Sequence, residues 1–96
     1  MAFSFLTQEI AMDLGTANTV IFRNDDIVMD APSIVAIDNN TGKCIAIGQQ
    51  AKLMHEHTNP GIKTIRPLRN GVIADFNAAE MMIKGFIKQV NNKKRS

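Results

Sequence analysis

The sequence predicts a small α/β domain in which short antiparallel strands precede one C-terminal helix. Two observations support this fold class. Short β-branched runs, separated by turn residues, fill the first two thirds of the chain, and an apolar stripe with helical period fills the end. With 96 residues, of which 45% are hydrophobic and 21% charged, the chain has room for one globular domain with a small core.

The first strands are expected to form an antiparallel meander. Residues 9–14, 19–23 and 27–29 read as three strands because they are rich in β-branched and apolar side chains. Tight turns separate them, the second at residues 24–26, and so short a connection forces neighbouring strands to run antiparallel. The Ala-Pro pair at residues 31–32 is expected to break the strand pattern.

A second hairpin and a short helix are expected next. Residues 33–38 and 43–47 read as strands around an Asn-Asn-Thr-Gly turn. Residues 49–55 read as a short helix that stops before Asn-Pro-Gly at 59–61, and residues 62–65 as one more short strand.

The helix near the C-terminus has the strongest signals. Asp75 is a plausible N-cap, and Asn77 with Glu80 offers an alternative capping box. Lys84 and Lys88 fall on the polar face of the helix. The apolar stripe recurs at three- and four-residue steps and consists of Ala79, Ile83, Phe86, Ile87 and Val90.

The charge distribution argues against a nucleic-acid partner. The formal net charge is +2, but three of the eleven basic residues lie at the end, at Lys93, Lys94 and Arg95. The other eight face nine acidic residues, so the body lacks the basic surface typical of nucleic-acid binding. Trp and Tyr are absent, which removes most candidates for base stacking.

The remaining reactive or apolar side chains are expected to be structural. Cys44, in the run Cys-Ile-Ala-Ile, is expected to be a small buried hydrophobe, and His55 and His57 to be surface residues rather than metal ligands. Arg66, Arg69 and Lys63 form a sparse basic patch for which surface solvation is expected. Met54, Met81 and Met82 are expected to fill the core.

One loop has the composition of a phosphate site. A strand ends in Asp13, and the loop Gly15, Thr16, Ala17 and Asn18 leads into the next strand. Small residues let the backbone approach a phosphate, so that loop N–H groups reach its oxygens. Asp13 suits a magnesium ion, held directly or through water. The alternative is an ordinary β-hairpin, in which Asp, Gly and Asn are common turn residues.

Four stretches together resemble the MreB family of bacterial actin-like proteins, in matching order and over nearly the whole chain. The resemblance implies an actin-like (ribonuclease H-like) ATPase fold, of which this chain is the N-terminal part. Residues 8–31 and 68–92 would belong to the ATPase core subdomain and residues 32–67 to an inserted small subdomain, between an apolar segment at 1–7 and a basic tail at 93–96. The stretches are Asp13–Thr19, Ala31–Asp38, Ile62–Leu68 and Gly71–Phe76.

The same resemblance implies a function. In the family, the position of Asp13 helps to bind magnesium and the loop from Gly15 to Asn18 wraps the β- and γ-phosphates of ATP. The second phosphate loop, the adenosine pocket and the acidic residue that positions water come later, beyond residue 96. The longer protein is therefore expected to be an ATPase and these 96 residues alone to be inactive. The alternatives are a sugar kinase or a chaperone ATPase of the same superfamily, or an interaction module that binds no nucleotide.

The resemblance also implies partners. A cytoplasmic, membrane-associated protein is expected, which assembles with itself into filaments and works with the cell-wall synthesis machinery. Two interpretations are open for Phe3, Phe5 and Leu6. They pack under the first strand, or they contact the inner face of the membrane. A chain without its later elements is expected to self-associate, through its sheet edges, its helix or an exchanged segment with a hinge near Ala31-Pro32 or Pro67.

Overall fold

The computed structural model describes the backbone of residues 3–6, 10–57 and 59–95, and the side chains of residues 10–57 and 59–92. Its elements in chain order are β1 (Phe3–Leu6), β2 (Ile10–Leu14), β3 (Asn18–Arg23), β4 (Asp26–Pro32), β5 (Val35–Asp38), β6 (Cys44–Ile47), α1 (Gln49–Glu56), β7 (Ile62–Ile65), β8 (Leu68–Arg69), β9 (Val72–Ile73) and α2 (Phe76–Arg95).

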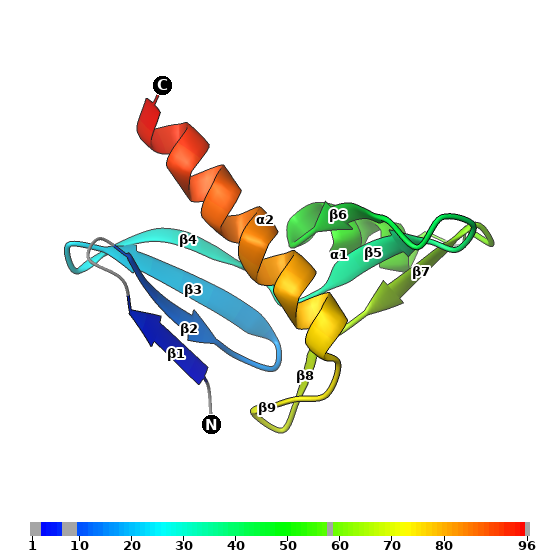
Figure 1. Cartoon of the computed structure of the whole chain (residues 1–96), viewed down its shortest axis with the longest axis horizontal. Helices are drawn as coiled ribbons and strands as arrows, with labels where there is room; N and C mark the ends of the chain where they lie inside the picture. The colour runs from blue at the N-terminus through cyan, green and yellow to red at the C-terminus, as the bar shows by residue number, and fades with distance from the viewer. Residues whose placement is uncertain (1–2, 7–9, 58, 96) are drawn as a thin grey trace.

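Strands β1 to β4 form one antiparallel sheet in sequence order, which confirms the predicted meander (Figure 1). The turn between β3 and β4 is tight, with φ of 52° at Asn24 and 68° at Asp25. Such left-handed turns match the twist of an antiparallel pair, and Asn and Asp adopt them at little cost.

Two features of this sheet differ from the prediction or add to it. Strand β4 continues to Pro32, so the predicted break at Ala31-Pro32 is wrong. Pro32 is the last residue of an edge strand, where the missing N–H removes no necessary hydrogen bond. Strand β1 is an additional edge strand, paired with β2. The side chains of Phe3, Phe5 and Leu6 lie outside the described residues, so both readings of them stay predictions.

The second sheet has the order β6-β5-β7, and both pairs are antiparallel. Helix α1 packs on it and begins and ends within one residue of the predicted range. Together they enclose a small separate core of Ile34, Ala36, Ala46 and Ala51. The predicted hairpin, short helix and strand at 62–65 are therefore confirmed.

Cys44 is exposed, so the prediction that it is buried is wrong. The register between β5 and β6 shifts after the pair Ala36–Ala46, so that Ile37 lies opposite Cys44. This bulge interrupts the alternation of sides, and it leaves both Cys44 and Ile45 exposed on an edge strand.

Helix α2 begins as predicted and extends further. The N–H of Ala78 donates to Oδ1 of Asp75 at 3.0 Å, which confirms Asp75 as the N-cap and excludes the alternative at Asn77. Lys84 and Lys88 are exposed, and Lys84 pairs with Glu80 at 3.8 Å on the helix surface. The predicted stripe is buried or half-buried, and Ala78 and Met82 join it.

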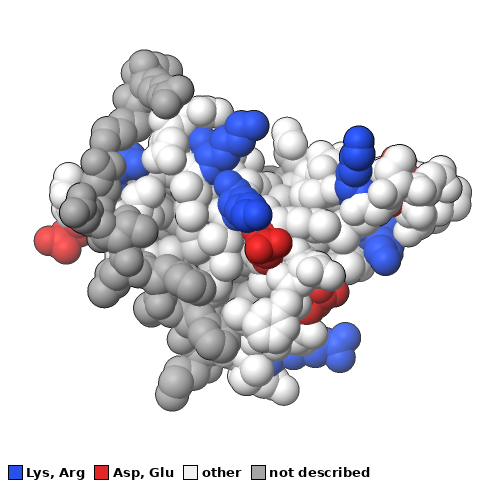
Figure 2. Space-filling view, in the orientation of Figure 1, with Lys and Arg blue, Asp and Glu red and all other residues white. Residues whose placement is uncertain are grey.

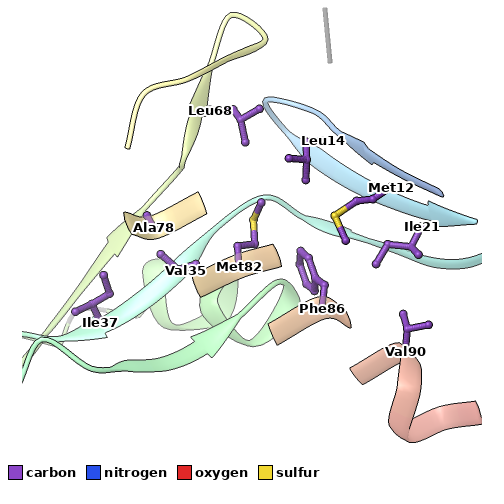
Figure 3. Packing of buried hydrophobic residues seen from close by; sticks show 10 residues of the cluster. All are labelled: Met12, Leu14, Ile21, Val35, Ile37, Leu68, Ala78, Met82, Phe86 and Val90. Atoms are coloured by element: carbon purple, nitrogen blue, oxygen red, sulfur yellow. The ribbon is translucent and has the colours of Figure 1, made fainter. Parts of the chain in front are cut away.

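Helix α2 lies across both sheets and gives them a common core (Figures 1 and 3). Its buried side chains contact residues of the first sheet, of β5 and of β8; the cluster comprises Met12, Leu14, Ile21, Val35, Ile37, Leu68, Ala78, Met82, Phe86 and Val90. Phe86, 1% exposed, lies at the centre of this arrangement. A Cβ atom built on Gly48 would lie 3.1 Å from the Phe86 ring and 3.4 Å from the Ala31 Cβ. The ring therefore reaches the place where the end of the first sheet meets the second.

The described residues include no membrane span, and the face drawn in Figure 2 shows no broad basic area. No helix in the described part of the chain is long and apolar enough to cross a bilayer. On the face drawn in Figure 2, the Lys and Arg side chains of the described residues do not join into one continuous basic area.

Removing the Phe86 ring should weaken the packing of α2 against the two sheets. We expect Phe86→Ala to lower the free energy of unfolding by about 3–5 kcal/mol, because it leaves a cavity where two sheets meet the helix. Phe76→Ala is the matched control on the same helix. Its ring is 77% exposed, and we expect a change within about 0.5 kcal/mol.

Urea unfolding followed by circular dichroism measures both values. Phe86→Leu is the milder variant if Phe86→Ala does not fold, with an expected cost below about 1.5 kcal/mol. Equal effects at positions 76 and 86 would contradict the packing described.

Candidate phosphate-binding site

The loop between β2 and β3 presents free backbone donors at its tip. The N–H of Gly15 donates to the carbonyl oxygen of Asn18 at 3.0 Å, which closes a tight turn. Thr16 and Ala17 at the tip are exposed, and within the described part of the chain their N–H groups have no acceptor. Adjacent free N–H groups in a tight loop are a common way to bind phosphate oxygens.

Gly15 is required by the narrowness of this turn. A Cβ atom at position 15 would lie 2.5 Å from the carbonyl oxygen of Asn18, closer than any real Cβ contact. The opposing group is backbone and cannot rotate away, so any other residue would widen the turn.

Ser33 anchors the loop from the end of β4. Its N–H donates to the carbonyl oxygen of Ala17 at 2.8 Å. Its hydroxyl lies 2.8 Å from that of Thr19, and both side chains are fully buried. A buried hydrogen bond of this kind is costly to break, because each hydroxyl would then lack a partner. Because Ser33 lies two residues before β5, these hydrogen bonds hold the loop close to the start of the second sheet.

A second anchor comes from the hairpin of β8 and β9. The N–H of Gly71 donates to the Thr16 hydroxyl oxygen at 2.8 Å. Asn70 and Gly71 have φ of 53° and 76°, the left-handed values that a two-residue hairpin turn needs. That turn directs the Gly71 N–H at the loop, while the Thr16 hydroxyl keeps its own proton for another acceptor.

The Asn18 side chain is oriented by an acidic neighbour. Its amide nitrogen donates to Oδ1 of Asp30 at 3.0 Å across the β3–β4 pair. This bond fixes the direction of the amide, and it places one carboxylate beside the loop.

A polar hollow of about 490 Å³ opens beside the loop, within the size range of small-molecule sites. Two cations, Lys52 of α1 and Arg66 after β7, face one carboxylate, Asp30, so the charged lining has an excess of one positive charge. The first sheet, its β2–β3 loop, helix α1 and the residue after β7 contribute to it, and the lining comprises Thr16, Ala17, Asn18, Asp30, Pro32, Gln49, Lys52 and Arg66. An anion is the ligand that this charge and the free N–H groups favour.

The predicted residues are thus only partly brought together. Thr16, Ala17 and Asn18 line the hollow, and Gly15 shapes the turn. Asp13 is half-buried and does not line it. Because side chains alternate along β2, Asp13 points to the sheet face opposite to that of the buried Met12 and Leu14.

The apolar hollow beside α1 and the two histidines are less suited to this chemistry. An apolar hollow of about 450 Å³ beside α1 is lined by Gln50, Leu53, Met54, His57 and Asn59, without Lys or Arg to hold a phosphate. His55 and His57 are exposed, and Nδ1 of His55 lies 2.6 Å from the Thr64 hydroxyl oxygen. Among the described residues no group of three His, Cys, Asp or Glu side chains is placed to hold a metal ion.

Sequence reasoning missed several residues of this site. Ser33 lies in one of the four stretches that resemble the family, but the sequence alone offered no reason to assign it a function. Arg66 was expected to be a solvated surface residue, and Lys52 and Asp30 were not singled out. Gly71 follows Asn70, and Asn-Gly is a strong signal for a two-residue hairpin turn that could have revealed β8 and β9.

Comparison with known proteins identifies close sequence relatives. The family described as MreB/Mbl protein matches residues 7–96. The cell shape-determining protein Mbl of Bacillus subtilis is 47% identical over 87 residues, and the cell shape-determining protein MreB of Escherichia coli is 42% identical over 91. Each match covers 90% of this chain and 26% of the relative, so the chain spans about a quarter of the length of these proteins.

Solved structures agree with the sequence comparison. MreB5 of Spiroplasma citri bound to ADP superposes with a TM-score of 0.74 at 35% identity, over 85% of this chain and 25% of that one. The same protein bound to AMPPNP gives a TM-score of 0.68 at 36% identity, over 82% of this chain and 23% of that one. The predicted actin-like fold is therefore confirmed for the part that this chain contains.

The steric requirement at Gly15 leads to a direct test. We expect Gly15→Ala to lower the free energy of unfolding by about 1–3 kcal/mol, the usual cost of overpacking. Gly61→Ala is the matched control, since a Cβ there would meet only the Asn59 side-chain oxygen at an ordinary 3.6 Å. Thermal unfolding compares the two. A neutral Gly15→Ala variant would show that the turn is wider than described.

Proposed function

Because this chain belongs to the MreB/Mbl family, we propose that it supplies the first phosphate loop of an ATP-binding, actin-like protein that determines cell shape. One observation supports this most strongly: the free N–H groups of Thr16 and Ala17 border a polar hollow that also holds Lys52 and Arg66. The matching Spiroplasma structures are bound to ADP and AMPPNP, which indicates the kind of anion.

Each part of the loop has a separate task in this proposal. Gly15 keeps the turn narrow enough for phosphate oxygens to reach the backbone. The N–H groups of Thr16 and Ala17 donate to those oxygens, and the Thr16 hydroxyl adds a third donor. Asn18 is held in place by Asp30 and completes the wall of the loop. Lys52 and Arg66 offset the phosphate charge from the side of the second sheet.

Asp13 is proposed to serve the magnesium ion that accompanies ATP. It lies two residues before Gly15, is half-buried and is the carboxylate nearest to the loop in sequence. Magnesium usually takes one or two protein carboxylates and fills its other positions with water and phosphate oxygens. Asp13 as a protein carboxylate is compatible with that ligand set. The ion would neutralise phosphate charge, and Asp13 would hold it directly or through water.

The wider biology of the family supplies the rest of the proposal. The longer protein would be an ATPase that assembles into membrane-associated cytoplasmic filaments and guides cell-wall growth. Residues 8–31 and 68–92 would belong to its ATPase core subdomain, and 32–67 to the inserted small subdomain. Phe3, Phe5 and Leu6 would contact the inner face of the membrane or pack under β2. The family match favours this reading over a sugar kinase, a chaperone ATPase or a module without nucleotide.

We expect the 96-residue chain alone to bind ATP weakly and not to hydrolyse it. The hollow has an excess of only one positive charge, and binding must first offset several kcal/mol of lost freedom. Isothermal titration calorimetry with MgATP should therefore give a dissociation constant well above the micromolar range. Micromolar or tighter affinity would contradict the incomplete site that we propose.

A chimera tests the role of Asp13 in hydrolysis. Residues 7–96 would replace the matching quarter of Bacillus subtilis Mbl, and MgATP hydrolysis and cell width would be measured. We expect Asp13→Ala in this chimera to lower turnover at least about tenfold, the effect of losing roughly 1.4 kcal/mol of transition-state stabilisation.

The control is Asp26→Ala, an exposed carboxylate at the start of β4 on the same sheet. It should hydrolyse ATP at the unmodified rate, and circular dichroism should be the same for both variants. Unchanged turnover in Asp13→Ala would refute the magnesium assignment, and a folded chimera without hydrolysis would refute the proposed function.

A further inference from the structure

Asp30 of β4 places a carboxylate in the wall of the phosphate hollow. It is the one acidic side chain among the described residues that line this hollow. Its Oδ1 accepts the hydrogen bond from the Asn18 amide, and within the described part of the chain its Oδ2 has no hydrogen-bond partner. Lys52 and Arg66 line the same hollow, but among the described residues neither forms an ion pair with Asp30. One carboxylate oxygen is therefore free to interact with a ligand.

A carboxylate is an unfavourable neighbour for a free phosphate. Both groups are negatively charged and both accept hydrogen bonds, so they repel each other at short distance. An adjoining hollow of about 590 Å³ has the opposite composition. It shares Thr16 and Arg66 with the candidate site, adds Arg69 and has no carboxylate among the described residues of its lining. A free anion is better suited to that lining, so Asp30 gives the phosphate hollow a different preference.

Magnesium would make the same carboxylate a favourable neighbour. A magnesium ion on a phosphate offsets part of the negative charge and usually keeps several water ligands. Those waters donate hydrogen bonds, and a carboxylate oxygen is a strong acceptor for them. The free Oδ2 of Asp30 therefore suits a hydrated magnesium ion better than bare phosphate oxygens.

We propose that Asp30 makes the hollow selective for the magnesium complex of a polyphosphate over the free anion. The inference rests on the phosphate site proposed above, and it adds the residue that decides which charge form is bound. Asp30 acts through water on the ion, and the hydrogen bond from Asn18 keeps its carboxylate beside the loop. This task differs from that of Asp13, which does not line the hollow.

The substitution Asp30→Asn separates the charge of this side chain from its hydrogen bond. The amide oxygen of Asn can replace Oδ1 as the acceptor for Asn18, while the negative charge is lost. The isotopically labelled chain would be titrated with ADP in EDTA and with ADP in excess magnesium, at one ionic strength because salt screens exposed charges. The backbone amide resonances of Thr16 and Ala17 report binding.

The quantity to compare is the magnesium preference, the dissociation constant of free ADP divided by that of MgADP. We expect a preference above one for the unmodified chain. In Asp30→Asn it should fall at least about fivefold, because the loss of one nearby like charge strengthens the binding of the free anion and leaves MgADP bound no more tightly.

Asp26→Asn is the matched control. It removes the same charge from the same strand, but Asp26 is exposed and does not line the hollow. Its magnesium preference should equal that of the unmodified chain. An equal fall in both variants would show that only the net charge of the chain matters, and it would overturn the proposal.

Asp30→Ala tests the alternative that Asp30 only orients Asn18. In that case Asp30→Asn would behave like the unmodified chain, and Asp30→Ala would weaken the binding of both forms of ADP equally. That result would overturn the selectivity of Asp30 and leave the proposed function intact. If neither form shifted Thr16 and Ala17 in the unmodified chain or in any variant, the phosphate site itself would be refuted, and this inference with it.

Discussion

The packing of α2 across both sheets is the constraint on which the rest of this structure depends. Phe86 reaches the junction near Ala31 and Gly48, and Gly85 lets the helix approach β6. A Cβ atom at position 85 would overlap Cδ1 of Ile47, so the Ile47 side chain would have to move if another residue stood there. This contact fixes the first sheet relative to the second.

The candidate site is a consequence of that fixed arrangement. The hollow takes its loop donors from the first sheet, but it takes Lys52 and Arg66 from the side of the second sheet. Neither half would bind an anion well alone, since two free N–H groups need nearby positive charge to offset a multiply charged phosphate. The loop itself is held from two further directions, by Ser33 and by Gly71. Packing in the core therefore positions a polar site that has little hydrophobic lining of its own.

The features predicted well from sequence are those with local causes. Asp75 caps α2 because its carboxylate reaches an N–H three residues later, and the stripe containing Phe86 follows from helical periodicity. The errors arose where contacts between strands, rather than the local sequence, determine the conformation or exposure of a residue. Pro32 remains in a strand because β4 is an edge, and Cys44 is exposed because a bulge against β5 changes its side.

The site shows the same division. The loop from Gly15 to Asn18 could be predicted because its small residues are consecutive. Its supports could not, because Gly71 lies 55 residues from Thr16 in the chain, and Lys52 and Arg66 reach the hollow only after the second sheet has docked. No local pattern of residues encodes such a contact.

The most direct test of a phosphate site shared between the β2–β3 loop and the residues beside the second sheet is a titration of the isotopically labelled chain with magnesium pyrophosphate, followed by backbone amide resonances. Our account predicts saturable shifts, at millimolar concentrations, concentrated at Thr16 and Ala17 and extending to Lys52 and Arg66. Shifts confined to the loop would show that Lys52 and Arg66 take no part in binding. The absence of any shift at Thr16 and Ala17 would contradict the central claim that these free N–H groups bind phosphate.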